Sequence, residues 1–140
     1  MDWFDYMMDI AHTVARKSKD ETKVGAVLMD KGYAVRGTAF NGPPKGVQDL
    51  PDRFVRPRKY LFASHAEQNI VAFAARHGVA TDGGIIVVTH FPCSSCARSL
   101  IQAGISEIWV GNGTTSMPED EFHTAEEMFL EAGVTIKRRE

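Results

Sequence analysis

Cysteine is scarce in this sequence, and neither sign of charge is in excess. The 140 residues include only two cysteines, Cys93 and Cys96, and the net charge is −2 at pH 7. This balance gives no general attraction to nucleic acid or to an anionic membrane surface. We therefore expect neither as a partner, and any phosphate group must be bound by a local set of basic residues.

Long hydrophobic runs are missing as well. The first ten residues, MDWFDYMMDI, carry acids where a secretory signal would be positively charged, and polar residues interrupt their apolar ones. We expect a cytoplasmic protein. The composition, 44% hydrophobic and 24% charged, is that of a globular protein long enough to bury a core. No repeat or linker divides the chain, which predicts a single domain over residues 1–140.

Hydrophobic periodicity predicts helices and strands in alternation. Apolar residues spaced by three and four indicate helices, and short β-branched runs bounded by turns indicate strands. The expected helices are residues 2–17, 65–77, 93–104 and 118–133, and the expected strands are residues 23–30, 33–41, 84–90, 107–111 and 134–138. A turn at residues 30–32 predicts a hairpin, and the later strand–helix–strand units require parallel crossovers. The predicted fold is a three-layer α/β/α domain with a central mixed five-stranded sheet.

The two cysteines form a C-x-x-C pair that can bind one zinc ion from a single helical turn. A purely structural zinc site requires four protein ligands, whereas this motif supplies two. We expect His65 as the third ligand because it and Cys93 both begin predicted helices, whose positive ends favour a thiolate. One histidine and two cysteines leave a tetrahedral ion with an open position, which is typical of catalytic sites. Glu67 would transfer protons there.

Each half of this pattern also has a simpler interpretation. A C-x-x-C pair alone is found in thioredoxin-like redox proteins. Ser64 and Glu67 fit a capping box at a helix start, with Ser64 as the N-cap residue. His-x-Glu followed by Pro-Cys-x-x-Cys, however, is the signature of zinc-dependent deaminases. The combination therefore favours a deaminase over either separate interpretation.

Four segments extend this signature to most of the chain. They are SKDETKVGAVLM, FNGPPKGVQD, RKYLFASHAEQNIV and THFPCSSCARSLIQAGISEI. With them, residues 2–112 resemble the cytidine deaminase-like zinc superfamily, and most of all its deoxycytidylate (dCMP) deaminases. The resemblance implies that the protein hydrolyses a small-molecule nucleotide, dCMP, to dUMP and ammonia, with Zn²⁺ as cofactor.

The resemblance also implies roles for residues around the metal. His65, Cys93 and Cys96 would be the zinc ligands. Glu67 would protonate N3 of cytosine and then the leaving amine, a general acid/base contribution of order 10²–10⁴-fold. The backbone amide of Ala66 would hold the pyrimidine carbonyl.

Other positions are expected to contact the rest of the nucleotide. The resemblance places Asn41 at the sugar, and Val24, Gly25 and Ala26 around the base. A 5′-phosphate needs cationic or amide donors. The candidates are Lys19, Lys23 and Lys45, then Arg53, Arg56, Arg58 and Lys59. Any one of these, taken alone, is better explained as a solvated surface charge.

The long segment 42–63 holds four of the six prolines and five basic residues, and loops of this length are usually functional. The family usually forms homo-oligomers, often hexamers. Many of its members are activated by dCTP and inhibited by dTTP through the loop that corresponds to residues 42–46, so the resemblance implies both properties here.

Two features depart from the family or lie outside its motifs. Gly111-Asn112-Gly113 stands where dCMP deaminases commonly carry tyrosines and offers no obvious phosphate ligand. His90 lies near the expected metal, where it would orient groups around the ion, belong to an effector site, or serve only the structure.

Other functions stay open at this point. One is a deaminase of another base, such as tRNA adenosine, guanine or C5-modified dCMP. An RNA-acting enzyme should present an extended basic surface, and the only terminal basic run is Lys137-Arg138-Arg139. A catalytically silent zinc module is a further alternative, although such a module has no use for the proton shuttle Glu67.

Overall fold

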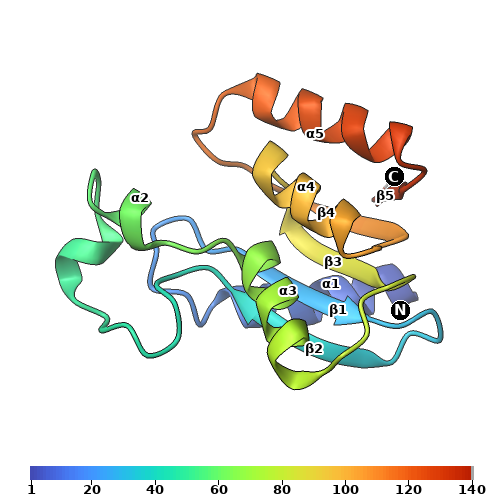
Figure 1. Cartoon of the computed structure of the whole chain (residues 1–140), viewed down its shortest axis with the longest axis horizontal. Coiled ribbons are helices and arrows are strands. Elements are labelled where there is room, and N and C mark those ends of the chain that lie inside the picture. The colour runs from blue at the N-terminus through green and yellow to red at the C-terminus, as the bar shows by residue number, and fades with distance from the viewer. Residues whose placement is uncertain (140) are drawn as a thin grey trace.

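The computed structural model describes residues 1–139, which form a five-stranded sheet with helices on both faces (Figure 1). The helices are α1 (Trp3–Ala15), α2 (Lys59–Phe62), α3 (Ala66–His77), α4 (Ser94–Gln102) and α5 (Glu119–Glu131), with a 3-10 turn η1 at Pro51–Phe54. The strands are β1 (Gly25–Met29), β2 (Val35–Phe40), β3 (Ile85–His90), β4 (Glu107–Gly113) and β5 (Thr135–Arg138). All nine elements expected from the sequence are present within these residues.

The sheet is mixed, as predicted. Its strand order is β2-β1-β3-β4-β5. β1 pairs antiparallel with β2 and with β3, whereas β3–β4 and β4–β5 are parallel. The tight turn after Asp30 joins β1 and β2, and the Asp30 carboxylate accepts hydrogen bonds from the backbone of Gly32 and Ala34. The parallel pairs have α4 and α5 as their connections.

Alternating side chains divide the core into two layers. On β1, Ala26 and Leu28 face α3, α4 and α5, whereas Val27 and Met29 face α1. All four side chains are fully buried, which explains why this strand is apolar throughout instead of alternating. The central sheet therefore has one helix on one face and three on the other, and the predicted three-layer fold is confirmed.

Two connections fix the starts of α3 and α4 on the same side of the sheet. α4 directly follows β3 after Phe91-Pro92-Cys93. Backbone hydrogen bonds join Gly42 and Ser64 in both directions, which ties the start of α3 to the end of β2. Asn69 of α3 donates from Nδ2 to the Phe40 carbonyl at 2.8 Å. Residues 65 and 93, far apart in the chain, are thereby held at one edge of the sheet.

The long segment 42–63 is ordered and contains η1 and α2. The guanidinium groups of Arg53 and Arg58 lie 4.2 and 5.0 Å from the centre of the Phe62 ring. Lys59 is buried and pairs with Asp20 at 3.1 Å. The two arginine–Phe62 contacts stabilise the segment internally, and the Lys59–Asp20 pair ties it to the chain that precedes β1.

Among residues 1–139, no helix is both long and apolar enough to cross a lipid bilayer.

Candidate metal centre and active-site cleft

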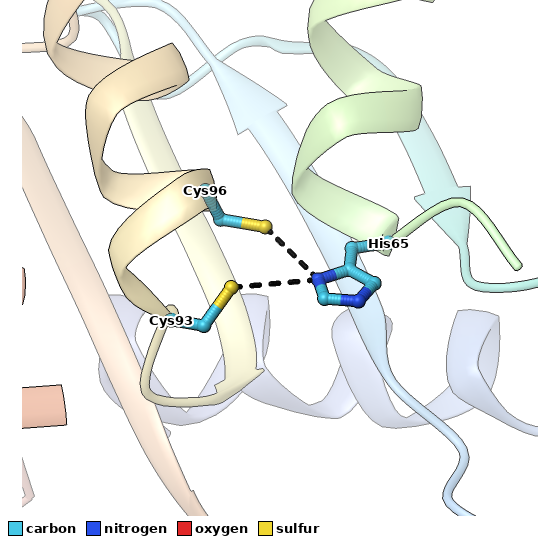
Figure 2. Close-up of side chains that lie close together, drawn as sticks. All are labelled: His65, Cys93 and Cys96. Carbon is cyan, nitrogen blue, oxygen red and sulfur yellow. Dashed lines mark hydrogen bonds between the residues drawn. The ribbon is translucent and has the colours of Figure 1, made fainter. Parts of the chain in front are cut away.

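His65, Cys93 and Cys96 lie together at the starts of α3 and α4 (Figure 2). His65 Nδ1 is 3.3 Å from the Cys96 sulfur and 3.5 Å from the Cys93 sulfur. All three potential ligand atoms lie within 4.8 Å of one another. The structure therefore gathers the three residues that the sequence singled out as metal ligands.

His65 and Cys93 are the N-cap residues of α3 and α4. The backbone N–H of Cys96 donates to the Cys93 sulfur and that of Gln68 to the Cys96 sulfur, and the positive helix ends favour negative sulfur. The backbone N–H of His65 donates to Gln68 Oε1 at 3.2 Å. The capping box thus uses His65 and Gln68, so the alternative with Ser64 and Glu67 is wrong because the helix begins one residue later.

Glu67 takes no part in the capping box and is buried, with 4% of its surface exposed. Burial raises the pKa of this carboxyl group to about 7, against the opposing effects of its own backbone N–H and of His65. A carboxyl group with a pKa near neutrality can both accept and release a proton at working pH, as a general acid/base must. Its position one residue from Ala66 and two from His65 brings this function to the metal cluster.

The two thiols differ in acidity. A hydrogen bond from Cys96 and, to a smaller extent, the neighbouring His65 together lower the pKa of Cys93 to about 4. The same hydrogen bond to Cys93 raises the pKa of Cys96. At neutral pH Cys93 is a thiolate, and Cys96 holds the proton that a bound cation would displace.

This donor set fits Zn²⁺. Two sulfurs and one imidazole nitrogen are ligands that zinc prefers, and a catalytic zinc site has three protein ligands and an open position. In the part of the chain that the structure describes, no further histidine, cysteine or carboxylate joins the three-residue group. The cluster therefore matches a catalytic zinc site better than a closed structural one.

A cleft opens over the cluster. Its floor includes His65, Ala66, Glu67 and Cys93, and its walls come from the segment 56–63 on one side and residues 115–122 on the other. Val24 and Asn41 also line it. Asn41 Oδ1 accepts the Val24 N–H at 3.0 Å, and its Nδ2 donates to the Thr22 carbonyl at 2.8 Å. Asn41 thus fixes the chain that enters β1 beside the cleft.

Not every predicted substrate residue lies in this cleft. Gly25 and Ala26 are outside its lining. Gly25 packs against α1, where an added Cβ would lie 2.0 Å from the Ala11 carbonyl oxygen, and Ala26 is fully buried under the other helical layer. The glycine is thus required for helix packing.

The three lysines proposed for the phosphate also lie elsewhere. Lys19 forms an exposed ion pair with Asp49 at 3.1 Å, and Lys23 donates to the Ser18 carbonyl. Lys45 is exposed in the segment 42–46 and is not part of the cleft lining. Arg56 and Lys59, from the wider set of basic candidates, do line the cleft.

Sequence reasoning missed the opposite wall of the cleft. Thr115, Ser116, Met117 and Phe122 line it, and Arg56 Nη2 donates to Ser116 Oγ at 2.7 Å across the opening. The only sequence signal was the polar GNGTTSM stretch after β4, which by itself is indistinguishable from an ordinary connecting loop.

Comparison with known proteins agrees with this geometry. The family model "Cytidine and deoxycytidylate deaminase zinc-binding region" matches residues 1–112. The chain belongs to this deaminase family. The deaminase is 38% identical over 138 residues to "Uncharacterized deaminase in luxG 3'region" of Aliivibrio fischeri, covering 96% of this chain and 91% of the relative. It is 33% identical over 145 residues to human deoxycytidylate deaminase, covering 99% of this chain and 80% of the human protein.

A solved structure has the same fold as this deaminase. The apo dCMP deaminase of cyanophage S-TIM5 superposes with a TM-score of 0.78 and 24% identity, covering 99% of this chain and all of the other. The predicted family, the cytidine deaminase-like fold, the Zn²⁺ cofactor and the activity of a zinc-dependent deaminase are confirmed by these comparisons together with the three-residue cluster.

Proposed function

We propose that this deaminase hydrolyses dCMP to dUMP and ammonia. The observation that carries the proposal is the buried carboxyl group of Glu67 beside three zinc-binding side chains, on the floor of a cleft whose opening carries Arg56. The similarity to human deoxycytidylate deaminase over 99% of the chain supports dCMP as the substrate.

His65, Cys93 and Cys96 would hold the zinc ion. When bound, Zn²⁺ lowers the pKa of water toward about 7 and so supplies a nucleophile at neutral pH. The protein's own contribution is to keep one thiolate ready at Cys93 and to aim both sulfurs and the imidazole at one point.

Glu67 moves the protons of the reaction. Its carboxylate takes a proton from the attacking water and delivers it to N3 of cytosine as oxygen adds to C4. The carboxylate then takes the remaining proton from the new C4 hydroxyl group and passes it to the amino group, so that the C4 carbonyl forms as the C4–N4 bond breaks and ammonia leaves. Because its pKa is raised to about 7, neither protonation state is strongly disfavoured, which suits alternating acid and base roles.

The remaining nucleotide contacts come from backbone and loop groups. Ala66 is the first residue of α3, where backbone N–H groups have no intrahelical partner and can bind the pyrimidine carbonyl. Asn41 lies beside this position and retains donor and acceptor capacity beyond its two hydrogen bonds. Val24 adds an apolar contact. These roles follow the predicted ones for Ala66, Asn41 and Val24.

Arg56 is the best candidate for the 5′-phosphate. It lines the cleft, and its guanidinium group is accessible next to the Ser116 hydroxyl. Arginine binds phosphate through paired hydrogen bonds. Lys59 lines the same wall, but Asp20 already neutralises its charge. Lys19, Lys23 and Lys45 lie farther away, so we assign them no contact.

The test is a side-by-side deamination assay. Ultraviolet absorbance would follow dCMP, dCTP, deoxycytidine and adenosine with the same enzyme sample, whose zinc content is determined in parallel. We expect one zinc per chain and turnover of dCMP well above the other three. Preferential turnover of adenosine, or of a C5-modified dCMP added to the series, would contradict the proposed substrate while leaving the deaminase family unaffected.

Several predicted properties go beyond the catalytic site. We propose that the enzyme is a homo-oligomer, in keeping with the predicted hexamer, and that dCTP and dTTP regulate it through residues 42–46. A single domain over residues 1–140, a cytoplasmic location and a role in pyrimidine metabolism also stay predictions. Light scattering and the dCMP saturation curve with each effector test the assembly and the regulation.

A further inference from the structure

His90 is a cleft residue that the proposed mechanism does not use. It is the last residue of β3 and lines the cleft three positions before Cys93. Its ring packs directly on Gly113 of β4: a Cβ atom at that glycine would lie 2.4 to 2.5 Å from Cε1, Cδ2 and Nδ1. Real Cβ contacts are never that short, so the ring can occupy this place only because residue 113 has no side chain.

Thr89 determines which nitrogen of His90 is free. The Thr89 hydroxyl is 2.7 Å from His90 Nδ1 and accepts the backbone N–H of Gly25 at 3.2 Å. Thr89 is 1% exposed, and a buried hydroxyl hydrogen needs an acceptor. In residues 1–139, Nδ1 is the acceptor within reach of that hydroxyl. The imidazole then carries its own hydrogen on Nε2, which is left to bind a ligand.

The imidazole is neutral in this environment. Burial lowers the pKa of His90, and the charge of His12 lowers it further. Because Nδ1 of the neutral ring is already hydrogen-bonded to Thr89, the ring presents one N–H donor, at Nε2.

A series of polar donors continues from His90 toward the cleft opening. Gly113, on which the ring packs, is followed by Thr115 and Ser116, both of which line the cleft. Ser116 in turn accepts a hydrogen bond from Arg56. An N–H, two hydroxyl groups and, across the opening, a guanidinium therefore line the cleft. Such a set suits an anion with several acceptor oxygens, such as a nucleotide phosphate.

We propose that His90 is a specificity-determining residue that donates its Nε2 hydrogen to the 5′-phosphate of the nucleotide. Gly113 provides the space in which its ring packs. This inference rests on the proposed function. It explains the glycine at residue 113, where the side chain of a tyrosine would occupy the space that the His90 ring fills. His90 would also supply, next to Gly113, the phosphate-binding group that residues 111–113 themselves lack.

Ligand binding tests the inference separately from turnover. The dissociation constants of dUMP and deoxyuridine would be measured by calorimetry on the zinc-loaded wild type, His90→Ala and His90→Gln. A hydrogen bond to a charged group corresponds to about a 10- to 100-fold change. We expect His90→Ala to raise the dissociation constant of dUMP by that factor and to leave that of deoxyuridine unchanged. His90→Gln, whose side-chain amide can donate a hydrogen bond, should recover part of the lost affinity for dUMP. His123→Ala, at an exposed histidine outside the cleft, is the matched control.

A double-mutant cycle tests whether the packing of the His90 ring on Gly113 matters for binding. Gly113→Ala alone should weaken the binding of dUMP about as much as His90→Ala does, because the new methyl group displaces the His90 ring. In the His90→Ala background the same methyl group meets no ring, so the second substitution should add little. Independent, additive losses would overturn the proposed coupling, and circular dichroism with zinc analysis identifies any variant that fails to fold.

The outcomes separate the two proposals. A wild-type enzyme that does not deaminate dCMP contradicts the proposed function. A wild type that does so, with His90→Ala binding dUMP normally, overturns only the role of His90. Equal weakening of dUMP and deoxyuridine would also overturn it, because the contact would then be to the base or sugar.

Discussion

The side chains of two N-cap residues lie against each other: the Cys93 sulfur is 3.5 Å from Nδ1 of His65. Each residue is the last before a helix begins, so two helix starts meet at one point. The zinc-binding cluster is therefore a product of where two helices start, and it should respond to changes at either start.

Replacing Glu67 by glutamine should abolish turnover and leave the fold and the zinc content intact. The amide keeps the size of the buried side chain but cannot accept or release a proton, so kcat should fall by at least the 10²–10⁴-fold typical of general acid/base catalysis. Steady-state kinetics on dCMP and zinc analysis of the same sample would show this. Glu127→Gln, on the exposed face of α5, should behave as wild type. Normal turnover by Glu67→Gln would remove the proton-transfer role.

Cobalt substitution should reveal the ligands of the metal. Zinc would be removed with a chelator, which should stop deamination, and Co²⁺ would be added to the apoprotein. Two thiolate ligands should produce a strong sulfur-to-cobalt charge-transfer absorption, and Cys93→Ser or Cys96→Ser should reduce its intensity by about half. His65→Ala should weaken cobalt binding with less effect on that band. An unchanged spectrum in either serine variant would exclude that cysteine as a ligand.

Glu121 should support the metal site through Ser94. Its Oε1 atom accepts hydrogen bonds from the Ser94 hydroxyl at 2.7 Å and the Ser94 backbone N–H at 3.2 Å, and Ser94 is the first residue of α4 after Cys93. These hydrogen bonds lower the pKa of the Glu121 carboxyl group. Glu121→Ala should lower zinc affinity by about tenfold, as loss of groups that orient ligands does.

The matched control is Glu119→Ala. Glu119 lies in the same first turn of α5 but is exposed and outside the cleft lining. Competition with a chromogenic chelator would give both affinities. Equal affinities for the two variants would mean that Glu121 only stabilises the surface.

The buried ion pair between Asp20 and Lys59 should be needed for stability. Their side chains are 6% and 10% exposed, and Asp20 Oδ1 lies 3.1 Å from Lys59 Nζ. Removing one partner leaves an unpaired buried charge, which typically costs about 3–5 kcal/mol. Asp20→Asn and Lys59→Met should each reduce the free energy of unfolding measured with urea by roughly this amount.

The double variant should lose less than the sum of the two single variants, because neither charge is then left alone. Lys19→Met breaks the exposed Lys19–Asp49 pair and should cost less than about 1 kcal/mol. Equal costs at the two lysines would contradict the assignment of Lys59 as a structural charge.

The sequence predicted the sheet, its helices and the metal cluster because these depend on patterns with strong physical signals. The short apolar runs of β1 and β3, bounded by turns, indicate buried strands, and Pro-Cys-x-x-Cys directly after a buried strand indicates where α4 begins. The start of α3 was less certain because Ser64 and His65 are both compatible with an N-cap. Only the two-way Gly42–Ser64 pairing shows that Ser64 still belongs to the preceding extended chain.

The lining of the cleft was harder to predict because side-chain directions depend on tertiary packing. Lys19 and Lys23 are near Val24 in the chain, yet Asp49 and the Ser18 carbonyl hold them away from the cleft. The four-residue helix α2 is too short to show any periodicity, and it carries Lys59 into the cleft wall. Arg56 owes its place to Ser116, sixty residues later, a relationship that no local pattern contains.

The pairing of β1 with β3 has a consequence for how the enzyme matures. It sets Ala26 opposite Val88 and Met29 opposite Ile85. A slip of one residue would move Cys93 by about 3.4 Å and exchange the side chains of β3 between the two helical layers, which would carry the sulfurs away from the imidazole. Only correctly aligned chains can then take up the ion tightly, so mass action favours that alignment whenever zinc is present. Zinc supplied during synthesis should raise the yield of correctly assembled protein, independently of its part in the reaction.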